Sequence, residues 1–245
     1  MHNIVPTSLM QATRFEFRAR WWVSFLIIVV AFLAYFIDHT GFSEAFVLGL
    51  AARVGTSPTD NWYRLFFCVG TLLLAACAGL HTWASSYMKL DVMVDSRIHT
   101  NRLLADGPYR YVRNPLYLGN IFLALGLGLV ASRLGFLILS LGMTVFHIRL
   151  ILREEAELVR DQGEPYQRYC AAVPRLFPSL TPRIPSGSNV PHWGQAFRVQ
   201  VVYWSLALAM GVFTVTLNIK IFWTLFAVAM GTLFLHKAPN VERPQ

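Results

Sequence analysis

Residues 107–119 read GPYRYVRNPLYLG and lead directly into an apolar run at residues 121–130. A second apolar run occupies residues 134–152, and a second polar, aromatic-rich segment begins at Arg153 and closes at Pro178. Two apolar helices joined by so short a turn are antiparallel neighbours. The stretch therefore predicts a helical hairpin that returns both polar segments to the same end, where two distant pieces of sequence form one site.

The composition is typical of a membrane protein. Hydrophobic residues make up 55% of the 245-residue chain and charged residues 14%, against about 25% charged residues in a soluble domain. Because a transmembrane helix needs about 20 apolar residues, we predict an all-α, polytopic transmembrane protein of about six spans, with an interfacial helix at residues 41–54. The predicted spans are residues 22–37, 62–80, 116–131, 134–152, 201–217 and 221–235.

The distribution of charge predicts the orientation. With the N-terminus in the cytosol, only Arg53, Arg64, Arg133 and Lys220 of the 21 Lys and Arg residues lie on the opposite side. This is the bias that the positive-inside rule describes. The formal net charge of +8 therefore needs no nucleic-acid partner, and the predicted site faces the cytosol. The three cysteines show neither a disulfide framework nor a zinc spacing.

The two polar segments share their order and spacing with a known family. At these positions the chain resembles the isoprenylcysteine carboxyl methyltransferase and phospholipid methyltransferase group of integral membrane enzymes. Asn114 stands where many members carry histidine, which excludes a mechanism that needs a histidine base at this position. The residues that carry the resemblance are Gly107, Tyr109, Arg113, Asn114, Pro115, Tyr117, Glu154, Glu155, Gly163, Glu164, Tyr166 and Tyr169.

The resemblance implies S-adenosyl-L-methionine as the cofactor. Carboxylates suit the amine and the ribose hydroxyls of this molecule, and aromatic faces suit its sulfonium and its adenine. The contacts to the cofactor that the resemblance implies fall on Leu103, Leu104, Tyr109, Arg113, Asn114, Pro115, Leu116, Tyr117 and Glu154.

The resemblance further implies an arginine that holds the methyl acceptor shortly before the pair of glutamates. We therefore predict catalytic roles for Arg149, Arg153 and Glu155. The alternative is that both arginines reach toward lipid headgroups and that Arg153 pairs with Glu157 four residues further along the helix. The acceptor is expected to be lipophilic and to enter from the bilayer. A prenylated cysteine, an aminophospholipid and a small hydrophobic metabolite all stay open.

Two interior positions carry further expectations. The small residues Gly126 and Gly128 are expected to allow close helix packing within the membrane. His147 lies inside the fourth predicted span, where a packed, neutral imidazole is expected and a role in a cavity is the alternative.

We divide the chain into three parts: N-terminal membrane helices at residues 1–98, a methyltransferase core at 99–178, and an extension with two predicted spans at 179–245. Two other functions stay open, namely an NADPH-dependent membrane reductase of the sterol-reductase type and a non-catalytic membrane protein. Paired acids at residues 154–155 favour S-adenosylmethionine over NADPH, because the additional phosphates of NADPH call for clustered basic residues.

Overall fold

The computed structural model describes residues 10–88, 105–187 and 189–236. Throughout these ranges the secondary structure is helical, and an isolated bridge between Gly41 and Ser132 is the one β-type pairing there. The predicted all-α class is therefore confirmed. The elements are α1 (Arg14–Arg18), α2 (Arg20–Leu33), η1 (Ala34–Phe36), α3 (Phe42–Val54), α4 (Asp60–Ser86), η2 (Gly107–Arg110), α6 (Pro115–Gly128), α7 (Arg133–Gln162), α8 (Glu164–Ala172), α9 (Trp193–Val199), α10 (Val201–Thr216) and α11 (Ile219–His236).

Among the described residues, two helices are long and apolar enough to cross a membrane by themselves. These are α4 with 27 residues and α7 with 30 residues, each with a window of mean hydropathy 1.9. The pair α9 and α10, bent by 65°, makes a third candidate. The shorter apolar helices include α6, whose 14 residues span roughly 21 Å at 1.5 Å per residue. All six predicted windows coincide with helices, whereas the number of six membrane crossings stays a prediction.

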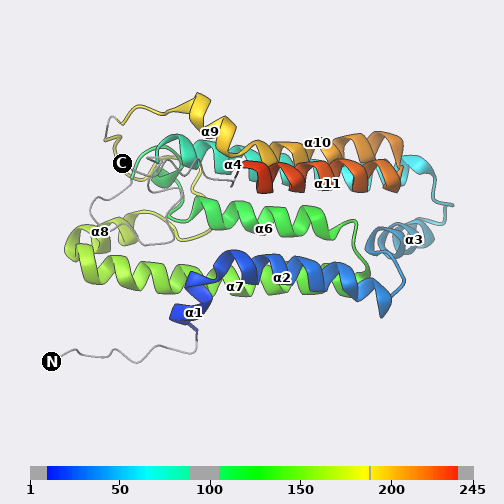
Figure 1. The fold of residues 1–245 in the computed structure, drawn as a ribbon, viewed down its shortest axis with the longest axis horizontal. Coiled ribbons are helices and arrows are strands. Elements are labelled where there is room, and N and C mark those ends of the chain that lie inside the picture. Colours follow the sequence, from blue (N-terminus) through cyan, green and yellow to red (C-terminus); the bar gives the residue numbers. More distant parts are fainter. Residues whose placement is uncertain (1–9, 89–104, 188, 237–245) are drawn as a thin grey trace, which may run out of the picture.

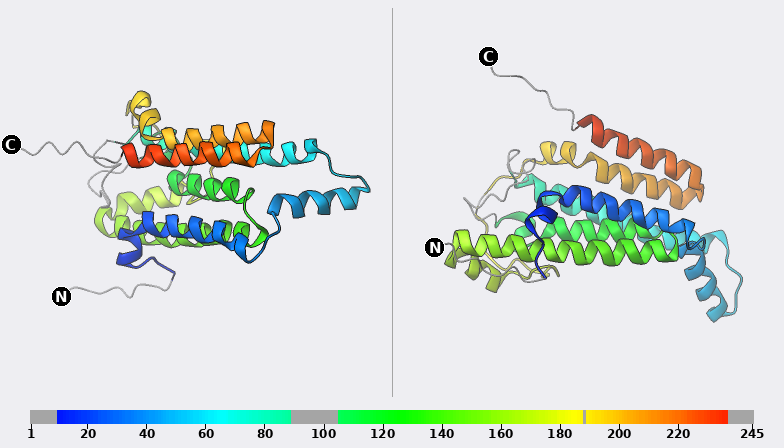
Figure 2. Two further views of the ribbon diagram at one scale, coloured as in Figure 1. Left: turned by 45° about the vertical axis from the view of Figure 1, so that its right-hand side comes forward. Right: turned by 60° about the horizontal axis from the view of Figure 1, so that its bottom comes forward.

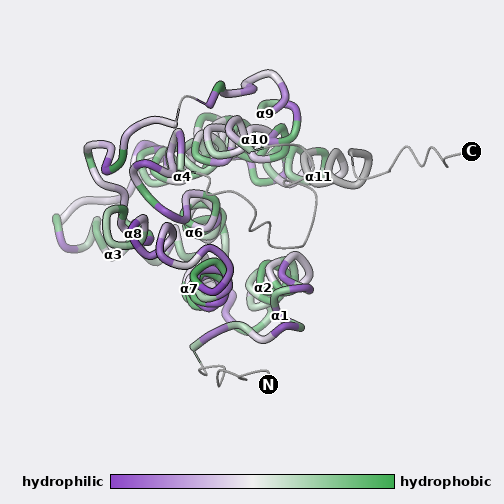
Figure 3. Tube along the Cα trace, turned by 90° about the vertical axis from the view of Figure 1, so that its left-hand side faces the viewer, coloured by the Kyte–Doolittle hydropathy of each residue, from purple (hydrophilic) through white to green (hydrophobic). Residues whose placement is uncertain are grey.

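The long helices form a layered bundle (Figure 1). Helix α6 packs between α4 and α7, α2 packs on α7, and α10 packs on α4 and carries α11. The C-terminal extension thus lies against the N-terminal part of the chain. Helix α3 projects from the end opposite α8 (Figure 2), and seen from the α8 end, polar residues gather on loops and helix termini (Figure 3).

The turn between α6 and α7 is held by backbone and side-chain caps. The Ser132 hydroxyl accepts a hydrogen bond from the Gly135 N–H at 3.1 Å, and Phe42 N–H donates to the Ala131 carbonyl at 2.9 Å. Asp38 accepts from the Arg133 guanidinium at 2.9 Å. This hydrogen bond, together with N–H donors from Leu134 and Thr40, lowers the pKa of Asp38 to about 2. The short hairpin that the sequence predicts is therefore confirmed.

Close helix contacts depend on glycine, as expected for Gly126. A Cβ added at Gly126 would lie 2.9 Å from the side chain of Leu74 on α4. One added at Gly128 would lie 2.8 Å from the ring of Phe136. The tightest approach is at Gly135, where a Cβ would lie 2.3 Å from the main-chain oxygen of Ala31. Helices α2 and α7 can approach this closely only because residue 135 has no side chain.

We expect Gly135→Ala to destabilise the protein by about 1–3 kcal/mol, because the backbone of α2 must move to relieve the overlap. The measurement is the unfolding midpoint of the detergent-solubilised protein. Gly79→Ala in α4 is the matched control, since a Cβ there meets nothing within 4 Å. An unchanged midpoint for Gly135→Ala would contradict the packing of α2 on α7.

Candidate active site

The two polar segments lie against each other at the α8 end of the bundle. Main-chain Arg113 N–H donates to the Pro174 carbonyl at 2.9 Å, and the Arg113 guanidinium donates to the Cys170 carbonyl at 2.7 Å. The Tyr169 hydroxyl donates to the Tyr109 carbonyl at 2.8 Å. Because α6 leaves this end and α7 returns to it (Figure 1), residues about 60 positions apart share one site, as the hairpin predicts.

Glu155 is the centre of these contacts. Its Oε1 accepts from the Asn114 amide at 3.0 Å, and its Oε2 accepts from Arg175 Nε at 2.9 Å. Arg113 Nε lies 3.1 Å from Oε1, and the side chains of Arg113 and Glu155 are only 8% and 7% exposed. A carboxylate with this many protein partners joins the two segments. Its contacts give it a positioning role, and the catalytic role stays a prediction.

Glu154 is arranged differently from its neighbour. Its Oε2 accepts a hydrogen bond from the Tyr117 hydroxyl at 2.7 Å, and within the described ranges its Oε1 has no hydrogen-bond partner. The guanidinium of Arg20, at the start of α2, acts electrostatically on both Glu154 and Tyr117. The half-buried carboxylate therefore has one oxygen fixed by the protein and one oxygen that can receive hydrogen bonds from a bound molecule.

Local backbone preferences place the first segment. Asn114 is the N-cap of α6 and Pro115 its first residue, the position where the missing N–H of proline leaves no donor unsatisfied. Pro115 is buried and Leu116 half-buried. Tyr109 lies in η2 and its hydroxyl donates to the Met88 sulfur at 3.4 Å. Burial raises the pKa of this hydroxyl, which keeps it a neutral donor. The predicted contacts Leu103 and Leu104 lie outside the described residues.

The two predicted arginines of α7 meet the N-terminal segment. Arg149 donates to both carboxylate oxygens of Glu16, at 3.1 and 2.9 Å. Arg153 pairs with Glu157 at 2.6 Å and donates to the Ala12 carbonyl at 3.0 Å. The alternative pairing of Arg153 with Glu157 is thus confirmed. The sequence held no signal for Glu16 and Ala12 as partners, because they lie more than 130 residues away.

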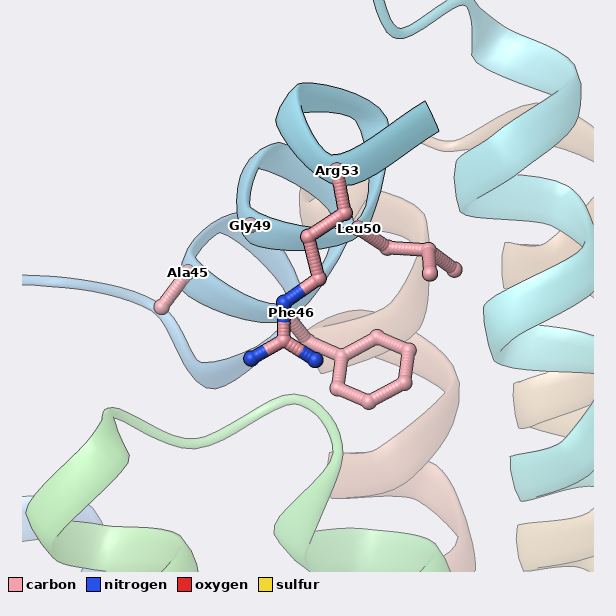
Figure 4. Close-up of a pocket in the computed structure, with 5 residues that line it drawn as sticks. All are labelled: Ala45, Phe46, Gly49, Leu50 and Arg53. Carbon is pink, nitrogen blue, oxygen red and sulfur yellow. The ribbon is translucent and has the colours of Figure 1, made fainter. Parts of the chain in front are cut away.

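A cavity of about 350 Å³ lies elsewhere, beside α3. It is lined by Ala45, Phe46, Gly49, Leu50 and Arg53, with the Arg53 side chain extending along the helix toward Phe46 (Figure 4). This cavity contains none of the predicted site residues, and α3 lies at the end of the bundle opposite α8 (Figure 1). Over the described ranges, no three His, Cys, Asp or Glu side chains are placed to hold a metal ion.

These features define a class: a helical, polytopic membrane protein with a two-segment polar site at one end of its bundle. The phospholipid methyltransferase family matches residues 65–162, which run from α4 to the end of α7. The chain is also 32% identical over 116 residues to the protein-S-isoprenylcysteine O-methyltransferase of Schizosaccharomyces pombe. These matches confirm the resemblance to the isoprenylcysteine and phospholipid methyltransferases.

The second match covers 47% of this chain and 48% of the relative. The chain therefore spans about half the length of the curated relative that it matches. No solved structure is significantly similar to the chain. The extension at α9–α11 lies beyond the residues that the family matches.

Proposed function

We propose that the protein is an integral membrane methyltransferase that uses S-adenosylmethionine and acts on a lipophilic acceptor. One observation carries the proposal: Asn114 at the start of α6 donates to Glu155 at 3.0 Å, next to the Glu154 carboxylate that Tyr117 orients. The family match covers both halves of this arrangement. The proposal includes six membrane-spanning helices, at the six apolar windows of the sequence. It also places the site on the cytosolic side, as the charge distribution predicts.

The residues present fit the cofactor. Oε1 of Glu154, which has no partner in the part of the chain that the structure describes, can accept from an amine or from ribose hydroxyls, and Tyr117 fixes the other oxygen. Asn114 uses both amide hydrogens on Glu155 and on the Arg175 carbonyl, which leaves its side-chain oxygen as the acceptor toward a ligand. When bound, S-adenosylmethionine would supply an electrophilic methyl group.

The role of the protein is then to position the reacting groups. Holding the acceptor in line with the methyl group in a site with little water lowers the barrier without any covalent intermediate. A carboxylate or thiolate acceptor needs no general base, and the motif contains no group suited to be one. In the resting arrangement, Glu16 and Glu157 neutralise Arg149 and Arg153. An anionic acceptor held by either arginine would compete with the corresponding glutamate for the guanidinium.

The test is a calorimetric titration of the purified full-length protein with S-adenosylhomocysteine, with NADPH as the parallel ligand. We expect saturable binding of S-adenosylhomocysteine and none of NADPH. Binding of NADPH alone would instead indicate a reductase, and binding of neither would indicate a non-catalytic protein. Transfer of a labelled methyl group to a prenylated cysteine or to aminophospholipid vesicles would then identify the acceptor.

A further inference from the structure

A chain of polar side chains crosses the interior of the bundle beside the site. His81 Nε2 on α4 lies 3.1 Å from the Asn120 side-chain oxygen on α6. The Asn120 amide nitrogen lies 3.2 Å from His147 Nε2 on α7, and His147 Nδ1 lies 2.7 Å from the Met143 carbonyl. His81 and His147 are 5% and 2% exposed. Three helices are therefore connected by one continuous run of hydrogen bonds.

The protonation pattern of this chain follows from its last member. The Met143 carbonyl can only accept, so His147 carries its proton on Nδ1 and accepts at Nε2. Asn120 must then turn its amide nitrogen toward His147 and its oxygen toward His81, which donates from Nε2. If the Asn120 side-chain amide were rotated by 180°, its oxygen would face the His147 Nε2, and two acceptors would oppose each other. All three hydrogen bonds can form with both histidines neutral. This agrees with the packed imidazole expected for His147.

Helical spacing places this chain directly beneath the Tyr117–Glu154 pair. Tyr117 and Asn120 are three residues apart and share a face of α6, and His147 and Glu154 are two turns apart on one face of α7. The rings of Tyr117 and His147 are 5.6 Å apart. A shift of α6 along α7 would therefore break the Asn120–His147 bond and the Tyr117–Glu154 bond together.

The row of hydrogen-bonded polar side chains also contacts the C-terminal extension. The His81 ring stacks on Tyr203 of α10, with centroids 4.1 Å apart. On its other side it lies against Gly119, where a Cβ would come within 2.5 Å of the imidazole. His81 therefore lies between α6 and α10. Helix α10 is outside the residues that the family matches.

Polar side chains in a membrane interior are costly and commonly serve a function, and a single buried amide can set the register of packed helices. We propose that Asn120, held by His81 and His147, is a positioning residue that sets α6 against α7 and thereby places Tyr117 against Glu154. This inference rests on the proposed function, because the placement of Glu154 matters through the cofactor. It assigns α10 the role of supporting the site through Tyr203 and His81.

The test is a double-mutant cycle on the affinity for S-adenosylhomocysteine, using Asn120→Leu and Tyr117→Phe. Asn120→Leu keeps the side-chain size but removes the amide, and we expect it to weaken binding roughly tenfold. In the Tyr117→Phe background it should weaken binding less than about twofold, because the bond that it acts through is already absent. Thr71→Val is the matched control: it breaks a partly buried hydrogen bond to Thr214, 2.9 Å long, between α4 and α10, and should leave affinity unchanged.

Full additivity in this cycle, or wild-type affinity of a folded Asn120→Leu protein, would overturn the inference. If Asn120→Leu does not fold, the pair His81→Gln and His81→Leu replaces it, since glutamine retains an N–H donor and leucine does not. We then expect weaker binding for leucine alone, and equal affinities would overturn the proposal. Failure of the wild-type protein to bind refutes the proposed function and this inference with it, whereas binding by wild type and Asn120→Leu alike refutes the inference alone.

Discussion

Replacing Glu154 with glutamine is expected to lower the affinity for S-adenosylhomocysteine by roughly 10- to 100-fold, the equivalent of one hydrogen bond to a charged group. The substitution keeps the shape of the side chain and removes its negative charge. Tyr117 can still donate to the amide oxygen, so the fold should persist. The loss therefore falls on the second oxygen, Oε1, which has no hydrogen-bond partner among the described residues and is the acceptor that we propose for the ligand. Calorimetric titration measures it.

The matched control for this prediction is Glu164→Gln. Glu164 lies near the same end of the bundle, at the start of α8, but its side chain is 75% exposed and pairs only loosely with Arg168 at 3.4 Å. Its neutralisation should leave affinity unchanged. A folded Glu154→Gln protein that binds as tightly as wild type would remove Glu154 from the cofactor site, while leaving open that the protein binds the cofactor through other residues.

Replacing Glu155 with alanine is expected to destabilise the protein by about 3–5 kcal/mol, because a buried cation then loses its counter-charge. The side chain of Arg113 is 8% exposed, and its hydrogen bond to the Cys170 carbonyl remains. The Asn114 amide loses one of its two acceptors and keeps the Arg175 carbonyl, and the Arg175 side chain loses its carboxylate partner. The measurement is the unfolding midpoint of the detergent-solubilised protein.

Two comparisons isolate the buried pair. Asp161→Ala removes a surface partner of Arg160, whose side chain is 70% exposed, and should change stability by less than about 1 kcal/mol. The double variant Arg113→Met/Glu155→Leu removes both buried charges and should be more stable than Glu155→Ala alone. A Glu155→Ala protein with the wild-type midpoint would show that Glu155 does not hold the two segments together.

The sequence predicted the scaffold well, because long apolar runs leave few alternatives to helices. The hairpin of α6 and α7 has a capped turn at Ser132, and α6 begins at Pro115, one residue before the predicted span. The same hairpin brought the two polar segments together. We predicted a cofactor contact for Glu154 and a catalytic role for Glu155, but the sequence did not show which side chains each glutamate meets. Successive residues on a helix face directions about 100° apart, so Glu154 meets Tyr117 whereas Glu155 meets Arg113 and Arg175.

The partners of the two α7 arginines could not be predicted from the sequence either. Only the packing of α1 and α2 on α7 brings Glu16 to Arg149 and Ala12 to Arg153. Likewise, Asn120 looks like an ordinary polar residue in an apolar run until α4 and α7 place a histidine on each side of it.

The amino-acid sequence by itself determined the helical class, the hairpin and the end of the bundle at which the site lies, because hydrophobic length and turn chemistry act locally along the chain. Tertiary structure alone decided which side chains meet there. That choice depends on how helices are rotated and shifted against each other, and it is set by contacts between residues far apart in sequence, such as Gly135 against Ala31 and His81 against Asn120.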